Sequence, residues 1–199
     1  MKEKKIIGIT GGIGSGKSVV MSLLEDRCKA AVLLTDLIAH DLMKVGEANY
    51  NGILEAFGTE ILDEHREIDR KKLGNIVFQD AEKLALLSSI THPNVVAETK
   101  KRAQKALEDA AYEMVCIESA LLFDTDLPEF CHETWYIYAD REIRIDRLME
   151  GRGYTREHCL SVIGKQKDET SYKEQADLVI DNSGTVEETW NQIAKQIEE

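Results

Sequence analysis

The sequence contains few of the residues that mark disordered, disulfide-linked or membrane-spanning chains. Only two prolines stand among 199 residues and hydrophobic residues make up 43%, which argues against disorder. The four cysteines are scattered without a CxxC pair, so neither a zinc site nor a redox pair is indicated, and such usage fits a reducing cytosol. No segment approaches the roughly 18 consecutive apolar residues that span a bilayer. We therefore expect a cytoplasmic protein without a membrane partner.

Positive charge is also scarce, because 25 lysines and arginines face 37 acidic residues and the net charge is −12. A general nucleic-acid binder would carry a basic face, so we expect no nucleic-acid partner. Local hydrogen-bond donors can still bind a small anion against this overall charge. The oligomeric state is left open by the composition.

Alternating apolar runs and helical periodicity predict an α/β fold. The strands are expected at 5–10, 31–35, 114–118, 134–139 and, more weakly, 177–181. Helices are expected at 17–28, 37–45, 70–79, 94–112, 141–150, 156–167 and 186–197. Strands that are apolar on both faces suit a parallel sheet covered by helices, so we predict a P-loop NTPase-type three-layer fold with about five parallel strands.

One stretch, 37–112, interrupts the alternation because it is helical almost throughout. It either forms a substrate-binding subdomain or simply covers one face of the sheet. We favour the subdomain, because ligands gather at the carboxyl ends of parallel strands.

A glycine-rich motif follows the first predicted strand and precedes a predicted helix. It matches GxxxxGK[ST] at every required position and reads Gly11, Gly12, Ile13, Gly14, Ser15, Gly16, Lys17 and Ser18. Backbone N–H groups of such a loop, through Val19, point at phosphate oxygens beside the positive end of the helix. Lys17 should reach the β- and γ-phosphates of ATP, and the Ser18 hydroxyl should ligate Mg²⁺. A mere glycine-rich turn would explain neither residue.

Two carboxylates end predicted strands. Asp36 follows the second one, where it suits either a general base or magnesium ligand or, equally, the N-cap of the helix from Leu37. Glu118 ends the third one and is either a second magnesium candidate or a partly buried acid satisfied by backbone donors.

Five arginines crowd into 141–156, which is unusual in an acidic chain. We favour a phosphate-binding role for Arg147 and consider one for Arg152, since mobile arginines that close over phosphates supply transition-state charge. Arg152 lies between Gly151 and Gly153, which can absorb backbone rotation in a closing lid. The other arginines are interpreted as members of a solvated helix paired with acidic neighbours.

A further signal is Pro93, which is interpreted as the start of a helix, with His92 as a local cap or a ligand contact.

The chain resembles the dephospho-CoA kinase family over nearly its whole length. The segments that carry the resemblance are ITGGIGSGKS, FGTEIL with IDRKKLGNIVF, THP, SALLFD, RLMEGRGYTREHCLSVIGKQ and ADLVIDNSG. After the phosphate loop no single segment is distinctive, whereas their order and spacing together are specific.

This resemblance implies transfer of the ATP γ-phosphoryl group to the ribose 3′-hydroxyl of dephospho-CoA, which gives CoA and ADP. Asp36 would be the general base, while Lys17, Mg²⁺ and Arg147 hold the phosphoryl oxygens. Asn182 joins the residues that bind ATP. The implied contacts to the acceptor are Thr10, Asp36, Arg70, His92, Leu121, Leu122 and Phe123.

The resemblance also implies a nucleotide-binding core (about 1–36, 113–140 and 169–199), a helical CoA-binding insertion (about 37–112) and a lid (about 141–168). Departures from the family pattern fall at Thr35, Ala120, Asp124, Arg144, Gly151 and Val162. The family commonly reads DAD where this chain has Leu34, Thr35 and Asp36, so only the second acid is present. Ala120 stands in place of a proline, Asp124 of a glutamate and Arg144 of a glutamine. Gly151 and Val162 stand in place of arginines, which weakens the prediction of a complete arginine set in the lid.

Two other functions are weighed against this one. Another P-loop nucleoside or nucleotide kinase would share the fold, but the HP and ALLFD segments argue against it. A non-catalytic ATP-binding switch would have lost catalytic residues, whereas Lys17, Ser18 and Asp36 are all present.

Overall fold

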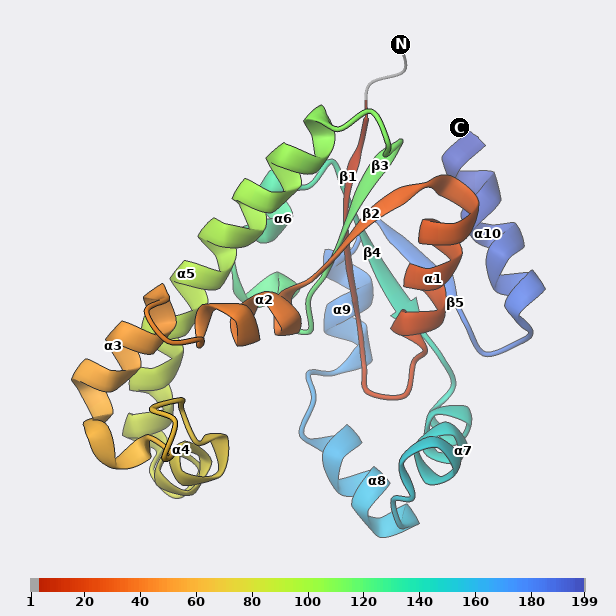
Figure 1. The fold of residues 1–199 in the computed structure, drawn as a ribbon. Helices are drawn as coiled ribbons and strands as arrows, with labels where there is room; N and C mark the ends of the chain where they lie inside the picture. The colour runs from red at the N-terminus through yellow and green to blue at the C-terminus, as the bar shows by residue number, and fades with distance from the viewer. Residues whose placement is uncertain (1–3, 199) are drawn as a thin grey trace. The chain divides into compact units, whose positions relative to one another are not determined.

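The computed structural model describes residues 4–198, and Figure 1 shows their arrangement. The strands are β1 (Ile6–Gly11), β2 (Ala30–Leu34), β3 (Met114–Glu118), β4 (Glu133–Tyr138) and β5 (Leu178–Asp181). The α-helices are α1 (Lys17–Cys28), α2 (Thr35–Leu42), α3 (Ala48–Phe57), α4 (Arg70–Val77), α5 (Ala81–Glu108), α6 (Leu127–Phe130), α7 (Arg141–Arg152), α8 (Arg156–Gly164), α9 (Glu169–Gln175) and α10 (Val186–Glu198). Short 3₁₀ helices, η1 and η2, occupy Thr59–Ile61 and Leu122–Asp124.

The five strands form one sheet in the order β2-β3-β1-β4-β5. The pairs β1–β3, β1–β4 and β4–β5 are parallel, and every residue of β1 is buried, as expected for a central strand covered on both faces. Ile9 lies opposite Glu118 on one side and Trp135 on the other. The chain therefore leaves the middle of the sheet at Gly11, where the glycine-rich motif begins.

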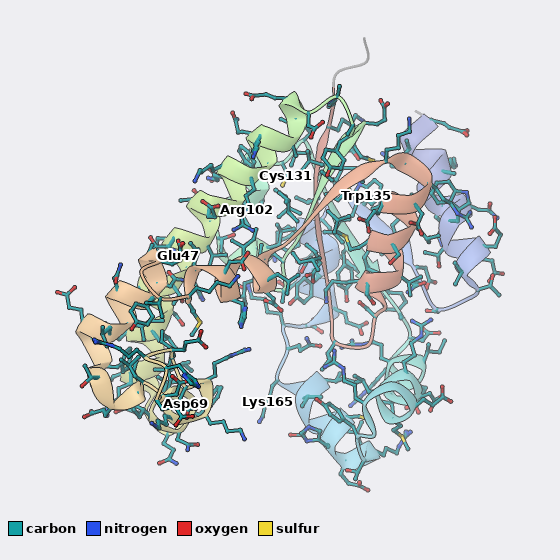
Figure 2. The ribbon with its side chains drawn as sticks, in the orientation of Figure 1. Glu47, Asp69, Arg102, Cys131, Trp135 and Lys165 are labelled. Carbon is teal, nitrogen blue, oxygen red and sulfur yellow. The ribbon has the colours of Figure 1, made fainter. Side chains whose placement is uncertain are left out.

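Helices cover both faces of this sheet. Figure 1 shows α1 beside α10, and the two helices are in contact. Trp135 lines one cavity with Trp190 of α10, whereas the neighbouring Tyr136 points to the opposite face and stacks on Tyr172 of α9 with ring centroids 5.0 Å apart. Figure 2 labels Trp135, whose side chain is fully buried. The aromatic residues of β4 thus anchor a helix on each face.

Contacts within the chain divide it into two compact units, one formed by 34–102 and the other by the rest. The unit 34–102 has its own apolar core, made of Ile53, Phe57, Ile61, Leu73 and Val77. Arg102 of α5, labelled in Figure 2, donates to Asp41 of the neighbouring helix α2 and, within α5, to Glu98.

The predicted helix start at Pro93 is wrong, because α5 runs without interruption from Ala81 to Glu108 and contains Pro93 in its interior. Its true start signal is Asp80, whose carboxylate accepts from the N–H groups of Glu82 and Lys83. The helix is reinforced beside the proline, since the Asn94 side chain donates to the carbonyl of Ile90 and to Asn49. Helix α9 was not predicted.

No helix among residues 4–198 combines the length and the apolar character needed to cross a membrane. None of the four cysteines is in a disulfide.

Candidate active site

The glycine-rich motif forms a loop between β1 and α1. Gly14 and Gly16 adopt φ values of 79° and 87°, a region that favours glycine, and the N–H of Ser15 donates to the Gly12 carbonyl. The Lys17 ammonium folds back over the loop, where it donates to the Gly11 carbonyl at 2.8 Å. Its Nζ also lies 3.5 Å from Glu118 Oε1 at the end of β3. The loop, with Lys17, and Glu118 therefore lie together at the carboxyl ends of β1 and β3.

Two hydroxyl groups at this edge are buried without a protein hydrogen-bond partner in the described part of the chain. They belong to Thr10, the fifth residue of β1, and to Ser15 in the loop itself. A buried polar atom without a partner costs free energy, so each is a position that a bound ligand or water would satisfy.

Two segments that are far apart in the sequence hold the loop at the Ser15 carbonyl. The Asn182 side chain donates to it at 2.8 Å, and Arg147 Nη1 lies 3.4 Å from it. Arg147 also donates to the Asn182 carbonyl, while Thr189 of α10 donates to the Asn182 side chain. A Cβ at Gly16 would lie 2.1 Å from Asn182 Nδ2, so this packing requires glycine there. The predicted ATP-binding residues from the loop, α7 and the β5–α10 connection are thus adjacent.

Arg144 was expected on a solvated face, and this expectation is wrong. Its side chain is 4% exposed and lies against the loop, with Nε donating to the Ile13 carbonyl at 2.9 Å. The signal that would have revealed it is helical spacing, because Arg144 lies on the same side of α7 as the buried Leu148 four residues later. By contrast, Arg156 pairs with Glu142 at the surface, as expected.

Helices α7 and α8 pack together through Ile145, Leu148 and Cys159. The stretch around Arg152 was expected to be a loop, whereas α7 continues through Gly151 and ends at Arg152, which is exposed. Helix α7 ends there because Gly153 adopts a left-handed conformation, with φ 65°.

The SALLFD segment follows β3 and contains residues in very different surroundings. Leu121 is 44% exposed, whereas Leu122 is fully buried and Phe123 lies against the ring of Tyr172. Asp124, which departs from the family pattern, forms an ion pair with Lys167.

A cavity of about 630 Å³ adjoins the loop, with Gly12, Arg144 and Gln166 among its lining residues. Two tyrosines also line it. Burial raises the pKa of Tyr136 to about 12, and the hydrogen bond to Asp140 raises the pKa of Tyr138 to about 12. Both phenols therefore stay protonated near neutral pH, and neither is suited to act as a general base.

The other predicted residues belong to the unit 34–102. Helix α2 begins at Thr35 with Leu34 as its N-cap, so Asp36 is exposed in the first turn and is not the N-cap. Arg70 is the first residue of α4, directly after the capping residue Asp69, and is exposed. His92 is half-buried inside α5. These three candidates thus stand on three different helices.

A parallel sheet in this order, with a phosphate-binding loop after its central strand and an arginine-bearing helix pair beside the loop, defines a P-loop kinase. A family model described as dephospho-CoA kinase matches residues 5–188. The chain belongs to the dephospho-CoA kinase family, which confirms the resemblance seen in the sequence. It is accordingly a kinase that transfers a phosphoryl group to a hydroxyl group, and the alternative functions are not favoured.

Individual relatives agree with this membership. A dephospho-CoA kinase of Carboxydothermus hydrogenoformans is 40% identical over 188 residues, which cover 94% of this chain and 90% of that protein. A solved structure from Thermus thermophilus is similar with a TM-score of 0.81 and 31% identity, and the match covers 99% of this chain and 98% of that one. A dephospho-CoA kinase of Campylobacter jejuni shares the fold, with a TM-score of 0.65, 23% identity and coverage of 98% and 97%.

Proposed function

We propose that this chain transfers the γ-phosphoryl group of ATP to the ribose 3′-hydroxyl of dephospho-CoA, and that Asp36 accepts the proton of that hydroxyl. The observation that carries the phosphate half of this proposal is the loop itself. Its Lys17 ammonium is held by a carbonyl and a carboxylate, and its Ser15 hydroxyl is buried without a partner. Such a cradle has the donors and the space that a polyphosphate requires.

Lys17 is assigned to the β- and γ-phosphates. Its bond to the Gly11 carbonyl orients the ammonium group, so little reorganisation is needed when charge develops on the transferring phosphoryl group. The N–H groups from Gly14 to Val19 run from the loop into the first turn of α1, which begins at Lys17, and the helix dipole there adds to the attraction for an anion.

Mg²⁺ is proposed beside the loop, with Ser18 as a direct ligand and Glu118 as a second candidate. The donor set fits, because oxygen ligands from one or two side chains together with substrate phosphates suit this ion. The described residues contain no group of three or more His, Cys, Asp or Glu side chains that would hold a metal by themselves, which suits a metal that arrives with the nucleotide. When bound, Mg²⁺ would neutralise charge on the phosphate oxygens.

Asp36 is assigned as the general base. Its carboxylate is exposed and is not used to cap α2, so it is accessible to an acceptor hydroxyl. Of the two acids in the family's DAD pattern only Asp36 is present, and it follows Thr35, whose side chain is buried. The two tyrosines with raised pKa values do not compete for the role.

Arg147 is assigned to the transferring phosphoryl group. It lies at the Ser15 carbonyl, and a shift of its guanidinium from the Ser15 and Asn182 carbonyls to phosphate oxygens would exchange neutral acceptors for charged ones. Arg152, exposed at the end of α7, is proposed as a second lid arginine, with Gly153 as the point of rotation.

The contacts to the acceptor are proposed at Thr10, Arg70, His92, Leu121 and Phe123. Leu122 is kept as a packing residue of this group because its side chain is fully buried. We also keep the expectation of a cytoplasmic location, which rests on the composition of the sequence.

The decisive experiment is coupled ADP release with dephospho-CoA, compared with adenosine, AMP and other nucleosides as acceptors. We expect rapid ADP release only with dephospho-CoA, and a product that carries the new phosphate on the ribose 3′ oxygen. Equal turnover of AMP or a nucleoside would reassign the acceptor, and ATP binding without turnover of any acceptor would favour the switch. The same assay with GTP tests the preference for the donor.

A further inference from the structure

Arg144 lies outside the glycine-rich motif but donates three hydrogen bonds beside it. Its Nε donates to the Ile13 carbonyl at 2.9 Å, its Nη2 to Gln166 Oε1 at 2.6 Å and its Nη1 to Glu169 Oε1 at 3.3 Å. Gln166 Oε1 accepts a second bond, from the N–H of Ile13 at 3.0 Å. Both backbone polar groups of one loop residue are therefore held by two side chains from a distant part of the chain.

We propose that Arg144 is a positioning residue that, together with Gln166, holds the phosphate loop in its binding conformation before the nucleotide arrives. This role goes beyond the assigned contacts of Lys17 and Arg147, and it rests on the proposed use of the loop for ATP. A loop that is already ordered does not lose conformational freedom when it binds, so the affinity for the nucleotide rises.

The hydrogen bonds of Arg144 favour a positioning role over direct contact with phosphate. The donors of Arg144 are aimed at three protein acceptors in three directions, which uses the fixed fork of a guanidinium. The group is almost completely buried, and Glu169, which is partly exposed, supplies the opposite charge. A Cβ at Gly12 would lie 2.4 Å from Arg144 Nη2, so the arginine is packed directly against the loop backbone.

This chain carries arginine where the family pattern has glutamine, so the comparison with Arg144→Gln is informative. A glutamine side chain has one carboxamide group and cannot reach three acceptors that lie in different directions. A lysine keeps the charge but replaces the planar fork by a single ammonium group. The two substitutions therefore separate the charge of Arg144 from its hydrogen-bond geometry.

The first test compares Arg144→Met, Arg144→Lys and Arg144→Gln with Arg141→Met in the full chain. Arg141 is a matched control, because it is on the same helix and lines the same cavity but is exposed. Hydrogen exchange of 11–18 is measured without nucleotide, and kcat and the KM for ATP are measured by ADP release. We expect Arg144→Met to speed exchange of the loop and to raise the KM roughly tenfold, the scale of one lost hydrogen bond to a charged group.

The value of kcat should change by less than about threefold, because a preformed loop stabilises ground state and transition state alike. Arg144→Lys and Arg144→Gln should restore neither the exchange nor the KM, and Arg141→Met should behave like the parent chain. If Arg144→Lys kept the exchange rate and the KM of the parent chain, the positive charge of Arg144 alone would explain its role. A fall in kcat at constant KM would make Arg144 a contact of the reacting group, and unchanged exchange and KM would overturn the proposal outright.

Gln166→Leu by itself keeps the test valid if Arg144→Met destabilises the fold, because it removes the acceptor of the Ile13 N–H and should also speed exchange and raise the KM for ATP. Where Arg144→Met is folded, a double-mutant cycle joins the two changes. The two side chains share the same loop residue, so the double variant should raise the KM for ATP no more than the larger single change. Additive effects would contradict a shared role. Exchange and the binding of a non-hydrolysable ATP analogue do not depend on the acceptor, so failure of the proposed reaction with dephospho-CoA would leave these readouts intact.

Discussion

The candidate residues around the phosphate loop and those in 34–102 are held in place by different kinds of contact. Asn182 donates to the Ser15 carbonyl across 167 positions of sequence, and Arg144 donates to the Ile13 carbonyl across 131. In 34–102, Asp69 accepts from the N–H groups of Lys71 and Lys72, two and three positions away, and Asp36 is exposed in the first turn of its helix.

The comparison indicates that the two halves of the proposed reaction respond differently to mutation. The phosphate loop is built from buried partners that belong to several elements, so a single change there should alter nucleotide binding or catalysis. The candidates in 34–102 stand near the ends of individual helices. A substitution there should therefore either remove one reacting group, as at Asp36, or weaken the local helix, as at Asp69. The predictions below test this division.

Lys17→Ala is expected to have the largest effect. Loss of the ammonium group should lower turnover by at least about 10²–10³-fold, the scale seen when a preorganised donor to a developing charge is removed. The measurement is coupled ADP release, with thermal unfolding to verify the fold. Lys165→Ala is the control, because Lys165 is an exposed lysine at the end of α8 and should retain full activity (Figure 2). Near-normal turnover by folded Lys17→Ala would remove the phosphate-loop assignment.

Asp36→Asn should lower the chemical step by at least about 10²-fold, the usual scale for loss of a general base. The KM for ATP should change little, because the carboxylate is proposed to act on the acceptor. Asp41→Asn is the matched control on the same helix, since Asp41 is occupied by Lys44 and Arg102 at the surface. A collapse of ATP affinity in Asp36→Asn would instead make Asp36 a metal ligand or a structural residue.

Arg147→Ala should depress kcat by about 10-fold or more and weaken ATP binding less, because the proposed contact strengthens as charge develops in the transition state. Arg144→Met, by contrast, is expected to raise the KM for ATP and to leave kcat nearly unchanged, although both arginines lie on α7 and touch the same loop. Arg156→Ala is the control, since Arg156 forms an exposed pair with Glu142. If Arg147→Ala changed KM alone, Arg147 would be a second positioning residue.

The smallest effect is expected at Asp69, whose substitution should change stability rather than chemistry. Hydrogen bonds from the backbone N–H groups of Lys72 and then Lys71 hold the pKa of the Asp69 carboxyl below its usual value. A lowered pKa in the folded state means that the unfolded chain binds the proton more tightly. The added stability is therefore present at neutral pH and is lost as the pH falls through the folded-state pKa.

We expect Asp69→Asn to keep the cap of α4 and Asp69→Ala to lower the Tm at pH 7 by a few degrees at most. Between pH 7 and about pH 3, the Tm of the parent chain should fall more than that of Asp69→Asn, because only the parent chain loses an ionised cap. Thermal unfolding across this range measures the difference, while the other acids titrate equally in both chains. A constant difference between the two would show that ionisation of Asp69 adds nothing to the cap.

Short-range features could be predicted from the sequence because they depend on neighbouring residues. The bounds of α1 and β3 agree with the predicted ranges, β1, β2 and β4 are each shifted by one residue, and β5 begins one residue later than predicted. A capping box opens α10, where Thr185 and Glu188 exchange hydrogen bonds, and its two residues are only three positions apart. Family membership was also accessible, because order and spacing of motifs are properties of the sequence alone.

The tertiary structure decided which polar groups near the loop are buried and what holds them. Arg144 looked like a solvated arginine among acidic neighbours, and only packing of α7 against the loop makes it a buried partner of Ile13. Pro93 carries a local signal for a helix start, yet α5 continues through it because the helix is already capped at Asp80 and reinforced at Asn94. Local patterns report the preferences of a few adjacent residues, whereas burial depends on segments that meet only after folding.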